Sequence, residues 1–86
     1  MYLKHVVIKN PTGLHARPAT QLVHLAEKYQ SSLEILKDSE IADMKSIFSL
    51  LAVGLAPGTE ITVRGEGADE KEAVESVCKF IESLEE

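Results

Sequence analysis

The residues best suited to chemistry are a histidine and an arginine, His15 and Arg17, which stand where an extended segment turns into a helix. The segment at 6–8 is apolar and β-branched, as a strand would be, and apolar residues recur at helical spacing from Ala19 onward. Pro18 fits the first helical turn, because its missing N–H would have had no partner within the helix. The pattern predicts that His15 lies at or just before the start of this helix.

This junction has the features of an anion site. A helix N-terminus presents backbone N–H groups and the positive end of the helix dipole. Arg17 adds a permanent cation whose forked donors suit phosphate oxygens. Thr12 and Gly13 precede the helix, where a hydroxyl donor and a flexible backbone can approach the same anion. Together these residues predict an anion site that contains a nucleophile.

Two interpretations of His15 remain open on this basis. An imidazole that is uncharged near neutral pH can attack phosphorus and carry a phosphoryl group as phosphohistidine. The other interpretation is a histidine that caps a helix and has no further role. The remaining histidines, His5 and His24, are predicted to be surface or edge residues of a strand and of the first helix.

Composition limits the classes of function. The 86 residues are expected to form a single domain, 1–86, with 44% hydrophobic and 27% charged residues. A net charge of −5 without clustered basic residues argues against direct binding of nucleic acid. The single cysteine, Cys78, excludes an internal disulfide and is predicted to be a buried apolar residue. We expect a soluble cytoplasmic protein without metal, cofactor or membrane insertion.

The periodicities predict seven elements in the order β-α-β-β-α-β-α. Strands are expected at 2–9, from 31, at 41–43 and at 60–67, and helices at 16 to 27 or 28, 47–53 and 70–84. This order predicts an α+β domain with one antiparallel sheet and its helices packed on a single side. The turn at 38–40 lacks glycine, which disfavours a two-residue primed turn. Asp69 and Glu72 are spaced to form a capping box at the last helix.

The short second helix has an unusual excess of apolar residues. Ser46 is its candidate N-cap and Gly54 its candidate stop. Large apolar residues at 47, 48, 50 and 51 exceed what one face can easily bury, so either part of the helix is an exposed partner surface or the whole helix is buried. A phosphate on Ser46 would be tolerated at a helix N-terminus and would add about −1.5 to −2 charges to such a surface.

Three sequence blocks, in this order, resemble the HPr family, the histidine-containing phosphocarriers of the bacterial phosphoenolpyruvate-dependent sugar phosphotransferase system. They are Gly-Leu-His-Ala-Arg-Pro-Ala at 13–19, Lys-Ser-Ile at 45–47 with Gly-Leu at 54–55, and Gly-Thr-Glu-Ile-Thr at 58–62 followed by Gly-Ala-Asp-Glu at 67–70. The resemblance spans essentially the whole chain. It implies an open-faced β-sandwich: a four-stranded antiparallel sheet covered on one face by three helices.

The resemblance also implies a function. His15 would accept a phosphoryl group on Nδ1 from phosphorylated Enzyme I and pass it to Enzyme IIA domains in sugar uptake, as a stoichiometric carrier rather than an enzyme. The residues expected to hold the phosphate are Arg17, Thr12 and Ala16. The partner surface around His15 would consist of Thr20, Ile47, Phe48 and Leu51.

Ser46 matches a regulatory site of the family. In lineages with an HPr kinase/phosphorylase, this serine is phosphorylated from ATP, and the product slows sugar transport and acts as a corepressor with a catabolite-control transcription factor. The alternative to sugar transport is therefore a mainly regulatory effector, or a carrier of a nitrogen-related phosphotransfer branch. A monomer is expected.

Overall fold

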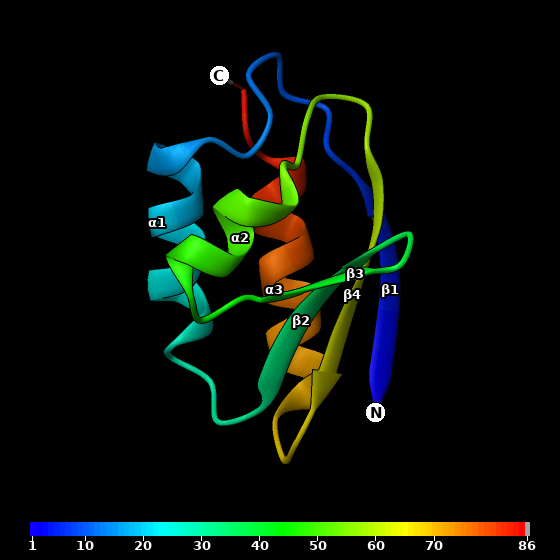
Figure 1. Cartoon of the computed structure of the whole chain (residues 1–86). Coiled ribbons are helices and arrows are strands. Elements are labelled where there is room, and N and C mark those ends of the chain that lie inside the picture. Colours follow the sequence, from blue (N-terminus) through cyan, green and yellow to red (C-terminus); the bar gives the residue numbers. More distant parts are fainter. Residues whose placement is uncertain (86) are drawn as a thin grey trace.

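The computed structural model describes residues 1–85, and its elements follow the predicted order (Figure 1). The bounds are β1 (Tyr2–Val7), α1 (Ala16–Ala26), β2 (Ser32–Lys37), β3 (Glu40–Asp43), α2 (Ile47–Val53), β4 (Glu60–Glu66) and α3 (Glu70–Glu82). The start of α1 is confirmed at Ala16, and the helix ends one or two residues before the predicted end. Element identity is therefore encoded in local sequence patterns, with small shifts at the ends.

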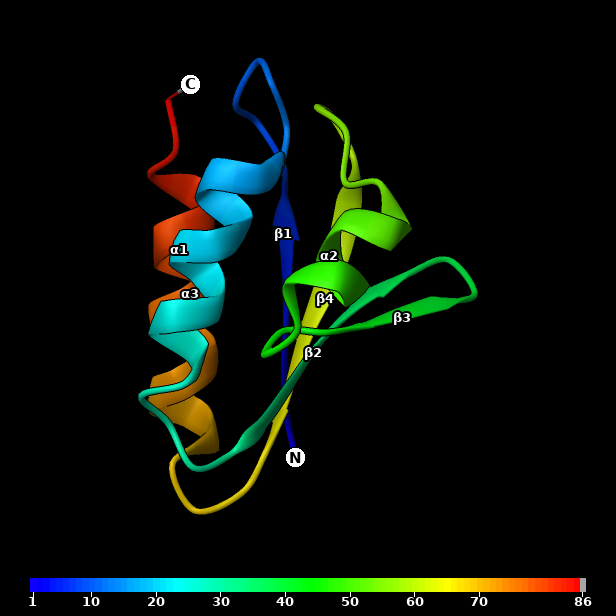
Figure 2. The same ribbon diagram turned by 60° about the vertical axis from the view of Figure 1, so that its left-hand side comes forward.

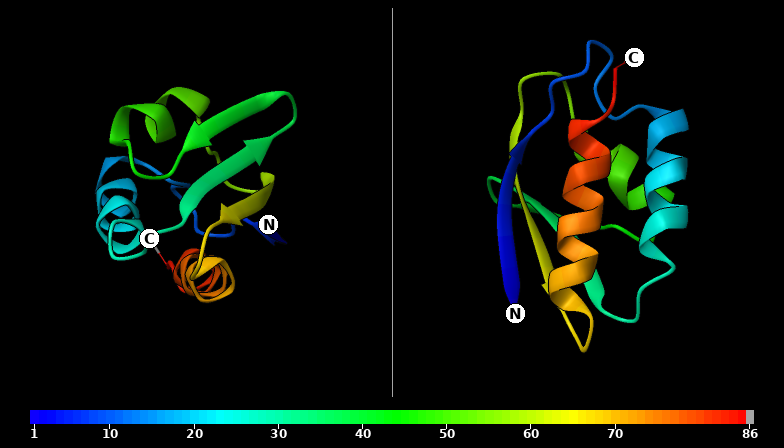
Figure 3. Two further views of the ribbon diagram at one scale, coloured as in Figure 1. Left: turned by 90° about the horizontal axis from the view of Figure 1, so that it is seen from below. Right: turned by 180° about the vertical axis from the view of Figure 1, so that it is seen from behind.

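The strands form one antiparallel sheet in the order β1-β4-β2-β3. Figure 2 shows α1 and α3 side by side on one side of this sheet, and the rear view in Figure 3 shows α3 lying along it. The predicted open-faced α+β sandwich is confirmed. Strands β1 and β2 follow each other in the chain, but β4 lies between them in the sheet. Helix α1 forms the crossover connection between these two strands.

The core lies between the sheet and the helices. Strand residues alternate as predicted, so that Ile35 and Val63 face each other across β2 and β4 and are both fully buried. On α1 the buried residues are Pro18, Ala19, Leu22 and Ala26, and on α3 they are Ala73, Val74, Val77, Cys78 and Ile81. The predicted inward residues Val23 and Leu84 are only half-buried at the edge of this core. Full burial of a valine, leucine or isoleucine side chain in such a core contributes about 1.5–3 kcal/mol to stability.

Cys78 is fully buried on α3, as predicted. Burial raises the pKa of its thiol to about 11. The thiolate, which is the reactive form of cysteine, is therefore disfavoured in the folded protein. Among residues 1–85, no helix combines the length and the apolar character needed to cross a membrane.

The hairpin between β2 and β3 corrects one prediction. Lys37 pairs with Glu40, so Asp38 and Ser39 alone form the connection, although a two-residue turn without glycine was disfavoured. Asp38 adopts φ +53°, in the left-handed region. Aspartate tolerates this region better than most residues, because its short side chain can bond the local backbone.

The start of α3 corrects a second prediction. Asp69 occupies the N-cap position, but its side chain makes no capping hydrogen bond, so the capping box with Glu72 is not formed. Its carboxylate instead accepts hydrogen bonds from the backbone N–H groups of Gln30 and Ser31, each at 2.9 Å, and from the Ser31 hydroxyl. Asp69 therefore joins the loop before β2 to the loop before α3, at the lower end of the molecule in Figure 1.

This contact makes stability depend on pH. The Ser31 hydroxyl and the Gln30 N–H hold the pKa of Asp69 below its ordinary value of 3.8. Because the unfolded chain binds the proton more tightly, the contribution of Asp69 is fully present above about pH 4 and is lost as pH falls through the folded pKa. In urea titrations, we expect Asp69→Asn to be less stable than the wild type at pH 6, with the difference shrinking below pH 4. A difference that stays constant down to pH 2 would contradict this assignment.

Candidate functional site

His15 occupies the N-cap position of α1 with extended backbone, φ −81° and ψ −171°. Its carbonyl oxygen accepts the hydrogen bond from the Ala19 N–H at 3.0 Å, while its side chain makes no capping hydrogen bond. The residue is exposed. The backbone of His15 therefore begins the helix and its imidazole is not used as a cap, which argues against the interpretation of an inert cap.

A tight turn leads into His15. The Gly13 N–H donates to the carbonyl oxygen of Asn10 at 3.1 Å, and the Asn10 side-chain amide donates back to the Gly13 carbonyl oxygen at 2.6 Å. Gly13 adopts φ +66°, which favours glycine. The Leu14 N–H then donates to the carbonyl oxygen of Leu55 at 2.8 Å. The backbone before His15 is thus held on both sides.

The loop between α2 and β4 supports this turn. The Ile8 N–H donates to the Thr59 carbonyl oxygen at 2.9 Å, and the Gly58 N–H donates to the Ile8 carbonyl oxygen at 2.6 Å. These bonds continue the β1–β4 pairing beyond the strand ends and bring the two loops together at the upper end of Figure 1. The turn before His15 is therefore held by backbone hydrogen bonds to a loop more than 40 residues later in the chain.

The other predicted phosphate-binding residues surround His15 in sequence and are accessible. Thr12, Ala16 and Arg17 are all exposed, the last two in the first turn of α1. Thr20 is half-buried, and its hydroxyl donates to the Ala16 carbonyl oxygen at 2.8 Å, so it is occupied within the helix. The start of α1 therefore carries an exposed histidine and an exposed arginine, together with the first backbone N–H groups of the helix.

Helix α2 is partly exposed, which decides between the two interpretations that the sequence allows for it. Leu50 is fully buried and Ile47 is half-buried, whereas Phe48 is 82% and Leu51 is 41% exposed. The interpretation of a fully buried helix is wrong. Helix α2, which carries these exposed residues, packs against α1 (Figure 2).

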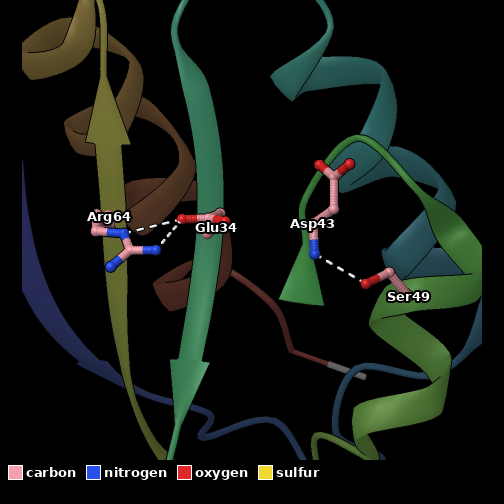
Figure 4. Close-up of polar contacts among 4 residues, drawn as sticks. All are labelled: Glu34, Asp43, Ser49 and Arg64. Carbon is pink, nitrogen blue, oxygen red and sulfur yellow. Dashed lines mark hydrogen bonds and ion pairs between the residues drawn. The ribbon is translucent and has the colours of Figure 1, made fainter. Parts of the chain in front are cut away.

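Ser46 caps α2 as predicted. Its hydroxyl accepts a hydrogen bond from the Ser49 N–H at 3.3 Å, and Gly54 ends the helix in the left-handed conformation. The Ser49 hydroxyl accepts in turn from the Asp43 N–H at 2.8 Å (Figure 4), which ties the end of β3 to the first turn of α2. The same figure shows Arg64 of β4 paired with Glu34 of β2 across the sheet.

Lysines hold both ends of α2 and were missed by sequence reasoning. The Lys45 ammonium donates to the Tyr29 carbonyl oxygen at 2.9 Å, which links the start of α2 to the chain beyond α1. The Lys37 ammonium donates to the carbonyl oxygens of Val53 and Gly54 at 3.3 and 3.2 Å. A cation there complements the negative end of the helix dipole. In the sequence, one is a lysine on a strand and the other a lysine just before Ser46, and neither pattern identifies so distant a partner.

The fold and this site define a class: a small open-faced α+β sandwich that presents a histidine at its surface, where another protein can reach it. Residues 3–83 match the family described as "PTS HPr component phosphorylation site". The chain belongs to the HPr family of the phosphotransferase system. Members of this family are phosphocarrier proteins in sugar uptake and not enzymes, and the family has Enzyme I and Enzyme IIA as partners.

Individual relatives agree over nearly the full length. The chain is 40% identical to phosphocarrier protein HPr of Buchnera aphidicola subsp. Baizongia pistaciae (strain Bp), over 98% of this chain and 99% of the relative. The crystal structure of HPr-C-His from Thermoanaerobacter tengcongensis is 38% identical, with a TM-score of 0.92 over 96% of this chain and 93% of that chain. Crh, a Bacillus subtilis catabolite repression protein, is 32% identical, with a TM-score of 0.79 over 100% and 99%.

Proposed function

We propose that His15 is the phosphoryl acceptor of this phosphocarrier. The observation that carries the proposal is an exposed imidazole at the start of α1 that makes no capping hydrogen bond. In the forward step, the Nδ1 lone pair attacks the phosphorus held by phosphorylated Enzyme I. The Nδ1–P bond forms as the bond from phosphorus to the donor breaks, and the donor group keeps that electron pair. Transfer to Enzyme IIA repeats the step with His15 as the leaving group.

The residues around His15 are suited to hold the phosphoryl group between these steps. Arg17 supplies a charge-assisted donor, and Ala16 supplies a backbone N–H at the positive end of the α1 dipole. Thr12, in the preceding loop, adds a hydroxyl. Positive charge and N–H donors next to His15 in the chain favour a group that brings negative charge. The phosphoryl group is thus bound through charge and hydrogen bonds at an open surface.

The linkage itself tests this proposal. The protein is incubated with Enzyme I and phosphoenolpyruvate labelled in its phosphoryl group, and the product is treated with acid and with base. Label that is lost in acid and retained in base identifies phosphohistidine, and peptide mapping should place it on His15. Acid-stable label, or label on another histidine, would overturn the assignment.

We further propose that the partners dock on the adjoining surfaces of α1 and α2. The residues are Thr20, Ile47, Phe48 and Leu51, of which Phe48 is the most exposed, at 82%. A large apolar residue in water gains by burial in a complex, and aromatic residues often dominate the affinity of such interfaces.

We also propose that the chain is a cytoplasmic, single-domain monomer, because Enzyme I and Enzyme IIA must reach the same histidine in turn.

Phe48 provides the test of this surface. We expect Phe48→Ala to lower the affinity for Enzyme I by about tenfold, since the buried ring contributes on the order of 1–2 kcal/mol. Its stability should change little, because the ring is mostly exposed in the free protein. The matched control is Ile41→Ala on β3, an apolar residue that is 57% exposed. Isothermal titration that finds equal affinities for the two variants would contradict the proposed surface.

We propose, as a second function, regulation through phosphorylation of Ser46 by an HPr kinase/phosphorylase. The position supports it: Ser46 is the N-cap of α2, where a phosphate meets the positive helix end two residues before Phe48. The added charge would weaken docking that depends on apolar contact and acidic partner groups, and the phosphorylated form is the one proposed to bind a catabolite-control transcription factor.

Labelling with ATP tests this second function. With HPr kinase/phosphorylase, label should be acid-stable and absent from Ser46→Ala, and its absence from the wild type would remove the proposal. The similarity to Crh keeps a mainly regulatory role as an alternative, together with a nitrogen-related branch. Loss of sugar uptake on deletion of the gene would favour the transport role over both.

A further inference from the structure

Asn10 is a buried polar residue in the turn that leads into His15, the proposed phosphoryl acceptor. It is 2% exposed, one of two buried polar residues among residues 1–85, the other being Ser31 just before β2. Burying an amide side chain is unfavourable unless it forms hydrogen bonds. The Asn10 side-chain N–H₂ donates to the Gly13 carbonyl oxygen at 2.6 Å. The buried amide of Asn10 therefore stabilises the turn that leads into His15.

This hydrogen bond acts on one rigid unit. The Gly13 carbonyl and the Leu14 N–H belong to the same planar peptide group. The carbonyl end accepts from Asn10, and the N–H end donates to the Leu55 carbonyl oxygen at 2.8 Å. Because both ends are held, the peptide plane cannot rotate without breaking a bond. The plane stands one residue before His15, so its orientation sets the direction in which the His15 backbone leaves the turn.

We propose that Asn10 is a positioning residue for phosphoryl transfer, acting through the Gly13–Leu14 peptide to aim the His15 imidazole. This inference rests on the proposed role of His15. Asn10 acts on the Gly13 carbonyl oxygen rather than on His15 itself, so the expected effect is on the geometry of the reacting nitrogen. Misplacement of a reacting group by as little as 1 Å costs on the order of 10²-fold in rate, so a looser turn should slow transfer measurably.

The test compares Asn10→Ala with Ser31→Ala. Both variants remove a buried polar side chain together with side-chain hydrogen bonding, but Ser31 bonds Asp69, at the start of α3. In steady-state transfer from phosphorylated Enzyme I, we expect Asn10→Ala to lower kcat roughly tenfold with KM changed less than about twofold. Ser31→Ala should leave both constants near their wild-type values. If Asn10→Ala does not fold, the assay uses Asn10→Asp, whose carboxylate has the same size but cannot donate to the Gly13 carbonyl.

A second measurement separates this inference from the proposed function. Hydrogen exchange of the Leu14 amide should be about tenfold faster in the Asn10 variant than in Ser31→Ala, because the peptide plane has lost one of its two bonds. Unchanged kcat in a folded Asn10 variant, or an equal loss in both variants, would overturn the inference. If the wild type accepts no phosphate, the role of His15 fails, and equal Leu14 exchange in the two variants would overturn the positioning role as well.

Discussion

A His15→Ala protein should accept no phosphoryl group from phosphorylated Enzyme I. The substitution removes the nitrogen that forms the bond to phosphorus, and loss of an attacking group lowers rates by about 10³-fold or more. The fold should persist, because the side chain is exposed and makes no capping hydrogen bond. The measurement is the label transferred from phosphoenolpyruvate, with the far-ultraviolet circular dichroism spectrum as evidence of folding.

The two other histidines are the controls for this experiment. His5 and His24 are exposed, as predicted, on β1 and on α1. The His5 Nδ1 lies 2.8 Å from the Thr62 hydroxyl oxygen, and its environment is the sheet surface rather than a helix start. We expect His5→Ala and His24→Ala to accept label at the wild-type level. Persistent label in His15→Ala, with loss of label in either control, would move the acceptor to another histidine.

Of the single substitutions proposed for this protein, Gly13→Ala should lower the free energy of unfolding most. At φ +66° a side chain is strained, and a Cβ atom would lie 2.5 Å from the Leu55 carbonyl oxygen, which accepts the Leu14 hydrogen bond. The turn and the loop at 55–57 would have to separate. We expect a loss of about 2–4 kcal/mol in the free energy of unfolding, measured by urea denaturation. Phosphoryl transfer should also slow, because the base of the His15 turn has moved.

Gly54→Ala is the matched control. Gly54 has nearly the same backbone conformation, φ +70°, but a Cβ atom there would have no neighbour within 4 Å. This substitution should cost only the conformational strain, about 1 kcal/mol. If Gly13→Ala and Gly54→Ala destabilise the protein equally, the close contact with Leu55 contributes nothing, and the turn is not held in the way described.

Much of this protein could be predicted from sequence alone, because the relevant information is local. The period of apolar residues specified the order of strands and helices, and the predicted start of α1 is confirmed at Ala16. Ser46 and Gly54 bound α2 as expected, since capping depends on neighbours within one helical turn. The placement of His15 at a helix start was predicted for the same reason.

Long-range contacts decided the rest. Asp69 had a local option, the capping box, but it bonds residues 38 and 39 positions away, because the fold brings three donors of the loop at 30–31 to its carboxylate. Lys37 reaches the end of α2 from 17 positions away. Neither partner follows from spacing along the chain, since both contacts exist only after the sheet has assembled.

The site shows the same division. Sequence alone placed His15 at a helix start, because Pro18 and the helical period that follows mark the beginning of a helix. Only the tertiary structure decided that the turn before it is held by Leu55, that Asn10 is buried beneath it, and that Phe48 stays exposed. The physical reason is that burial and hydrogen-bond partners depend on which distant segments pack together, whereas helix and strand periods depend on neighbouring residues.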